Sequence, residues 1–154
     1  MKTLRQWFNE YGVSHQNKTN KTIHFIGVLA IIFCIVGMLM SISSAVISEY
    51  LNINNPFLEN WAMPVSILLL IFYIRWSFST FVRMLTFSIL CLMGNYFLSR
   101  ISPLFYTSLA IFAVAWIGQF YGHKREGKKP SFFKDLQFLL IEPVWVFEKI
   151  SQKK

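Results

Sequence analysis

The sequence contains only three histidines, and they fall in two segments at opposite ends of the chain. His15 precedes the first long apolar stretch, His24 lies at its beginning, and His123 follows the last one. Glu126 comes three residues after His123, and helix bundles use His and Glu at i and i+3 to bind metal ions. Imidazole and carboxylate ligands suit iron(II), zinc or copper, and with open coordination positions they suit non-haem iron oxygen chemistry. These residues therefore predict a metal site made by both ends of the chain.

Each candidate also has a simpler interpretation. A single interfacial histidine is more often hydrogen-bonded or headgroup-facing than a metal ligand, and Glu126, set among basic residues, is by default a solvated acid in weak ion pairs. Arg75 and Arg83 could pair with a substrate carboxylate, although anchoring the membrane topology is their commoner role. On expected helices, polar residues share faces with the histidines: Asn17, Asn20 and His24 at i, i+3 and i+7, Tyr11 and His15 at i and i+4, and Gln119 and His123 at i and i+4.

The composition is that of a membrane protein. Hydrophobic residues make up 55% of the 154 residues and charged residues only 14%, which lies outside the range of soluble proteins. The net charge of +8 comes from basic residues that flank apolar runs without forming a stripe, so we expect topology signals and headgroup contacts and no nucleic-acid partner. Cys34 and Cys91 lie inside apolar runs without a partner at metal or redox spacing, which predicts buried, inert thiols.

Four apolar segments predict an all-α, polytopic membrane bundle. Residues 22–48 and 103–121 are long enough to cross a bilayer, which takes roughly 20 apolar residues. Residues 61–75 and 84–99 are apolar but short, and they fit either two thin spans or one re-entrant hairpin. We therefore expect about four transmembrane helices in a single membrane domain that covers residues 1–154.

The distribution of basic residues predicts that both termini are cytoplasmic. The N-terminal segment, residues 1–21, is basic, whereas the loop over residues 49–59 has two acids and no Lys or Arg. The tail, residues 122–154, carries eight Lys or Arg against four Asp or Glu and should form an interfacial amphipathic helix. An even number of membrane passages then separates His24 from His123, so the histidines share one face. Such a multi-pass protein fits a bacterial inner membrane, or the endoplasmic reticulum of a eukaryote.

Several common catalytic motifs are missing from the sequence. It has no GxSxG, P-loop, GxGxxG or zinc-binding CxxC motif, which argues against serine hydrolysis, nucleotide-driven transport and dinucleotide redox chemistry. Two other classes stay open beside a metal-dependent enzyme. One is a membrane haem protein with His24 and His123 as axial ligands. The other is a non-catalytic scaffold or small transporter whose histidines only hydrogen-bond at the interface.

The two histidine segments resemble those of the 2-hydroxy fatty acid dioxygenase family, whose fungal member acts in phytosphingosine breakdown. The resemblance implies an iron(II)-dependent α-oxidation in which a 2-hydroxy fatty acid and dioxygen give the fatty acid one carbon shorter and carbon dioxide. The patterns that carry it are Trp7-Phe8-x-x-Tyr11-Gly-x-Ser-His15-x-x-x-x-Asn20-x-x-Ile23-His24-x-x-Gly27 and Trp116-x-x-Gln119-Phe120-x-Gly122-His123-x-x-Glu126-Gly-x-x-Pro130.

The resemblance also implies roles for individual residues. His15, His24 and His123 match the motif histidines and are expected to hold Fe²⁺, with Glu126 as a fourth ligand or as a neighbour that orients a ligand. A 2-hydroxy carboxylate can chelate iron through one carboxylate oxygen and its hydroxyl, so three protein ligands plus this chelate would leave one octahedral position for dioxygen. Weaker candidates for hydrogen bonding to the ligands or for contacting substrate are Tyr11, Asn17, Asn20, Gln119, Arg75 and Arg83.

Overall fold

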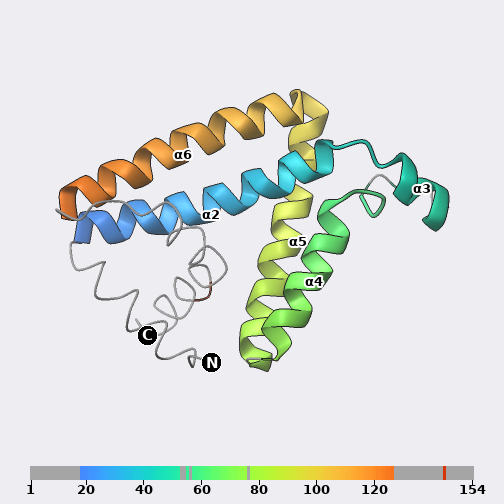
Figure 1. Cartoon of the computed structure of the whole chain (residues 1–154), viewed down its shortest axis with the longest axis horizontal. Helices are drawn as coiled ribbons and strands as arrows, with labels where there is room; N and C mark the ends of the chain where they lie inside the picture. The colour runs from blue at the N-terminus through green and yellow to red at the C-terminus, as the bar shows by residue number, and fades with distance from the viewer. Residues whose placement is uncertain (1–17, 53–54, 56, 76, 127–143, 145–154) are drawn as a thin grey trace. The chain divides into compact units, whose positions relative to one another are not determined.

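A computed structural model describes residues 18–52, 55, 57–75, 77–126 and 144 (Figure 1). Every regular element within these residues is a helix, which confirms the all-α prediction. The predicted C-terminal interfacial helix lies outside the described residues, apart from the single residue Val144. The helices are α2 (Lys18–Ser41), α3 (Ala45–Leu51), α4 (Ala62–Ile74), α5 (Phe78–Ile101) and α6 (Leu104–Glu126).

Three helices in the described part of the chain are long and apolar enough to cross a membrane. These stretches are Thr22–Ser41 in α2, Phe78–Ile101 in α5 and Leu104–Gly122 in α6. The remaining apolar helix, α4, has only 13 residues. Most of the side chains on α5 and α6 face outward, which suits helices whose apolar surface is solvated by lipid.

The first helix ends before the boundary at residue 48 that the apolar composition predicts. Ser41 Oγ donates a hydrogen bond of 2.7 Å to Gly37 O, and Ser43 and Ser44 separate α2 from the short helix α3. Serine hydroxyls compete for backbone carbonyls and so favour helix ends. Hydropathy does not register this break, because serine carries no charge and the flanking residues remain apolar.

Helix α5 is longer than the predicted segment 84–99, since it begins at Phe78 and ends at Ile101. The sequence-based boundary stopped at Arg83 because a charge interrupts the apolar run. A single arginine has good helix propensity, however, and does not end a helix. The C-terminal end comes at Ser102, which has an extended backbone, as the following Pro103 favours.

The chain divides into two compact units, residues 1–31 with 113–154 and residues 32–112. The second unit contains α3, α4, α5 and the adjoining parts of α2 and α6. Asn95 ties two of its helices together, because Asn95 Nδ2 donates to Phe33 O on α2 and to Cys91 O on α5, both at 2.9 Å. Its apolar core comprises Val36, Ala62, Cys91 and Leu92, with Phe33, Leu39, Met40, Phe57, Met63 and Phe87 packed against them.

Glycines allow close helix approach inside this second unit. A Cβ added to Gly37 would lie closer than 3.0 Å to both Asn95 Oδ1 and Ser108 Oγ, and one added to Gly94 would lie 2.7 Å from Phe33 Cε2. Small residues at helix crossings are typical of membrane bundles, where association depends on packing and on interhelical hydrogen bonds. Gly37 is thus the point where polar side chains from α5 and α6 meet α2.

Candidate metal-binding end of the helix pair

The first unit pairs the beginning of α2 with the end of α6. The two helices run antiparallel, with the N-terminal end of α2 beside the C-terminal end of α6 (Figure 1). Ile23 Cγ2 lies 3.9 Å from the position of a Cβ on Gly118, and Gln119 lies against Gly27. The helix ends that carry His24 and His123 therefore lie at the same end of this pair.

His24 lies on the inward face of α2. Only 2% of the His24 surface is exposed. Gly27, Val28 and Ile31 are buried at i+3, i+4 and i+7 from it, whereas Ile26 on the opposite face is 67% exposed. His24 is thus the polar member of an otherwise apolar buried stripe. A buried imidazole must have its ring nitrogens satisfied by hydrogen bonds or by a metal ion.

Gln119 projects from α6 across the backbone of α2 at Gly27. Its Nε2, Cδ and Cγ atoms lie 2.9, 3.2 and 3.4 Å from the position that a Cβ on Gly27 would occupy. The residue is 5% exposed, and no donor among the described residues reaches its Oε1 atom. An unsatisfied buried amide oxygen costs about 1–3 kcal/mol. Asn95 Oδ1 is a second such atom among the described residues.

Other predicted ligands are placed only by their backbones or not at all. His123 lies one turn beyond Gln119 on α6, and Glu126 is the last residue of that helix. Asn20 lies one turn before His24 on α2. The side chains of all three are outside the described structure, and so are residues Tyr11, His15 and Asn17 in full. The described residues contain no cluster of three His, Cys, Asp or Glu side chains, and His24 alone of the predicted ligands has a described side chain.

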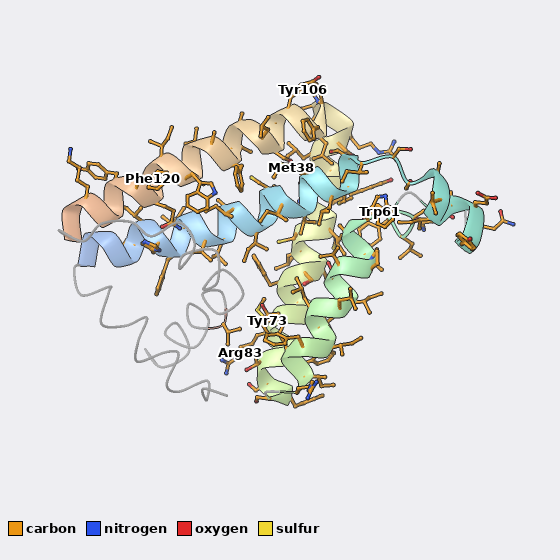
Figure 2. All side chains as sticks on the ribbon, in the orientation of Figure 1. Met38, Trp61, Tyr73, Arg83, Tyr106 and Phe120 are labelled. Carbon is orange, nitrogen blue, oxygen red and sulfur yellow. The ribbon has the colours of Figure 1, made fainter. Side chains whose placement is uncertain are left out.

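Arg75 and Arg83 belong to the second unit, at the turn between α4 and α5. Arg75 is exposed and Arg83 is half-buried, and Figure 2 shows Arg83 and Tyr73 near that turn. Tyr73 is only 2% exposed. Neither α4 nor α5 contains an Asp or Glu to neutralise Arg83. An arginine inside an apolar hairpin without an acid suits an anionic partner.

The residues described at the end of the α2–α6 pair fit a bound iron ion in chemical type. His24 offers a buried imidazole, which is a common ligand of iron(II) in proteins. The sequence alone does not predict that Gly27 is the contact point for the Gln119 side chain. The one feature of the sequence that could have indicated it is its position three residues after His24, on the same face of the helix.

Fold and site together define a small protein whose described elements are all helical, with three helices among the described residues able to span a membrane and a buried histidine where α2 packs against α6. The chain belongs to the Mpo1-like family, whose model, described as 2-hydroxy-palmitic acid dioxygenase Mpo1-like, matches residues 1–154. This match confirms the resemblance seen in the two histidine segments. No curated protein and no solved structure matches the chain.

Proposed function

We propose that this protein is an iron(II)-dependent dioxygenase that converts a 2-hydroxy fatty acid into the fatty acid one carbon shorter and carbon dioxide. The family name supports a 2-hydroxy fatty acid as the substrate class and a dioxygenase as the class of enzyme. The observation that supports the proposal is that the beginning of α2 and the end of α6, which carry part of the family's histidine pattern, belong to one compact unit in which His24 is buried. The proposed ligands are His15, His24 and His123, with Glu126 as a fourth ligand or as a neighbour that orients a ligand.

The reaction needs no second cofactor. One 2-hydroxy acid and one dioxygen give the shorter acid, carbon dioxide and water, so the substrate itself supplies the four electrons that dioxygen accepts. Bound iron(II) would supply a Lewis acid for the 2-hydroxy carboxylate and a binding position for dioxygen. This accounts for a dioxygenase whose sequence lacks flavin and nicotinamide motifs.

The residues of the chain itself bind and orient the substrate. Apolar helices next to the site can hold the acyl chain, because each buried methylene contributes about 0.8 kcal/mol. The polar head then lies at the helix ends, where Lys124 is exposed on the last turns of α6. Burial of His24 excludes water from one side of the site. In this proposal both termini face the cytoplasm, so the head enters from the cytoplasmic leaflet.

Alanine substitution of His15, His24 and His123, one at a time, tests the proposal. Wild-type protein reconstituted anaerobically should bind about one iron and consume one dioxygen per 2-hydroxypalmitic acid, whereas each variant should lose iron and turnover. Ile26→Ala is the matched control, since Ile26 lies on α2 but is 67% exposed and faces away from α6. Retained turnover in all three histidine variants would contradict the proposal. A Soret band with haem would favour the haem protein, and no bound iron would favour the scaffold.

A further inference from the structure

We propose that Cys34 and Cys91 form a dithiol pair that an organic hydroperoxide dissolved in the lipid oxidises to a disulfide, which joins α2 to α5. They are the only two cysteines in the sequence, and both are free thiols in the structure. Cys34 is 0% exposed and Cys91 is 2% exposed, and both belong to the second unit. The proposal depends neither on iron nor on the proposed reaction.

The first support is the close approach of α2 and α5 beside these residues. Asn95 Nδ2 donates at 2.9 Å to Cys91 O and, also at 2.9 Å, to Phe33 O, the carbonyl of the peptide bond to Cys34. One nitrogen atom therefore bridges the backbones next to both cysteines. A Cβ on Gly94 would lie 2.7 Å from Phe33 Cε2, so the missing side chain of Gly94 is what lets the two helices approach here.

The second support is the position of each cysteine on its helix. Cys34 stands three residues before Gly37 and Cys91 stands four residues before Asn95, so each shares a helix face with one member of the contact between Gly37 and Asn95. The two thiols are close enough for a charge on Cys34 to act on Cys91. The crossing of α2 and α5 thus brings together the only two thiols of the chain.

The surroundings of the two thiols favour a disulfide over a metal site. A metal ion would need deprotonated thiols, which are costly in an apolar core, and the described residues bring no third His, Cys, Asp or Glu to them. A disulfide carries no charge and suits the interior of a membrane bundle. Because both thiols are buried, a charged oxidant in water should not reach them, whereas an apolar hydroperoxide can enter through the lipid.

The oxidation balances with one molecule of hydroperoxide. The sulfur of one thiol attacks the outer peroxide oxygen, the O–O bond breaks, and the alcohol leaves with the thiol proton, which gives a sulfenic acid. The sulfur of the second thiol attacks the sulfenic sulfur, the S–O bond breaks, and water leaves with the second proton. Two thiols and one hydroperoxide therefore give a disulfide, an alcohol and water. The reaction should be slow, because the thiolate is the reactive form of cysteine and the core disfavours charge.

The test treats the purified protein in lipid vesicles with cumene hydroperoxide, unfolds it, alkylates the free thiols and measures its mass. Wild-type protein should lose both alkylation sites, regain both after reduction with a phosphine, and run as a monomer on a non-reducing gel. Before reduction it should also unfold at a higher dodecyl sulfate fraction, because the disulfide constrains the unfolded chain. Oxidised glutathione, which is charged and stays in water, should leave both thiols free.

A matched control moves one thiol to the outer face of α5. The double variant Cys91→Ala with Met93→Cys keeps two cysteines, but Met93 is 44% exposed, so its new thiol should not join Cys34. Two free thiols, two separate sulfinic acids or a disulfide between two copies in the wild-type protein would overturn the inference. An equal yield of the internal disulfide in the double variant would overturn it too. The wild-type result decides even where the variant fails to fold.

Discussion

Replacement of Gly37 by alanine should destabilise the second unit by about 1–4 kcal/mol. The new Cβ would lie closer than 3.0 Å to Asn95 Oδ1 and Ser108 Oγ, and both of these residues are fully buried. Asn95 is held by hydrogen bonds of 2.9 Å from its Nδ2 to Phe33 O and Cys91 O. The Asn95 amide therefore cannot move without breaking one of these bonds or shifting a helix, whereas Ser108 Oγ, which has no hydrogen-bond partner among the described residues, can move only by rotating within a fully buried site.

The magnitude comes from three opposing contributions. An extra methyl in a packed site typically costs about 1–3 kcal/mol. Loss of the interhelical bond from Asn95 to Phe33 O adds about 0.6 kcal/mol on average, and about 1.7 kcal/mol at most, as measured for membrane helices. Alanine is about 1 kcal/mol better than glycine in a helix, which offsets part of this cost. The net effect stays destabilising because the two oxygens approach from different helices.

Gly118→Ala is the matched control for this change. Gly118 also lies on an apolar helix, but among the described residues its Cβ would meet Ile23 Cγ2 alone, at an ordinary contact distance of 3.9 Å. The gain in helix propensity should therefore dominate and stabilise the protein by up to about 1 kcal/mol. The two substitutions are chemically identical, so their opposite signs would isolate the contact at Gly37.

The assay is unfolding of purified protein in mixed micelles by rising dodecyl sulfate, followed by tryptophan fluorescence and circular dichroism. Gly37→Ala should unfold at a clearly lower detergent fraction than the wild type, and Gly118→Ala at an equal or higher one. A Gly37→Ala variant as stable as the wild type would refute the packing of Asn95 and Ser108 on Gly37. Equal losses in both variants would show that the contact geometry does not decide the outcome.

Three further predictions concern packing, substrate binding and topology. Gly94→Ala should cost less than Gly37→Ala in the same assay, because its Cβ meets only the movable ring edge of Phe33 at 2.7 Å, and Phe33→Leu in the same chain should recover the loss. Arg75→Ala and Arg83→Ala should raise the KM for a 2-hydroxy fatty acid while kcat stays constant, and an unchanged KM in both would exclude a carboxylate contact. Reporter fusions at either terminus should both respond as cytoplasmic, and opposite responses would contradict the even number of passages.

The sequence predicted the helices well where hydropathy is uniform and less well where it changes. A long uncharged run is sufficient to identify a span, because any helix that crosses lipid must satisfy its backbone within itself. The end of α2 at Ser41 and the beginning of α5 at Phe78, before Arg83, depend on local hydrogen bonding and on backbone propensity, which hydropathy does not measure. The division of residues 22–48 into α2 and α3 followed from three serines rather than from any charge.

The candidate site could be predicted in part for a similar reason. Helical periodicity predicts which residues share a helix face with His24 and which share one with Gln119. The even number of predicted membrane passages between them predicts that the helix ends carrying these residues lie on the same side of the membrane. The contact between Gln119 and Gly27 could not be predicted, because it depends on the rotation and register of two helices that are far apart in sequence. The ligand set of His15, His123 and Glu126 stays a prediction.

Two buried amides in this protein meet a glycine of α2 in opposite orientations. Asn95 turns its oxygen toward Gly37 and donates from its nitrogen to two backbone carbonyls, so its amide is fixed by hydrogen bonds of the fold. Gln119 turns its nitrogen toward Gly27 and keeps its oxygen away from it. Both amide oxygens lack a donor among the described residues, so an unsatisfied oxygen does not by itself separate a functional amide from a structural one. The difference lies in the nitrogen, because that of Asn95 joins α5 to α2 through Phe33 O.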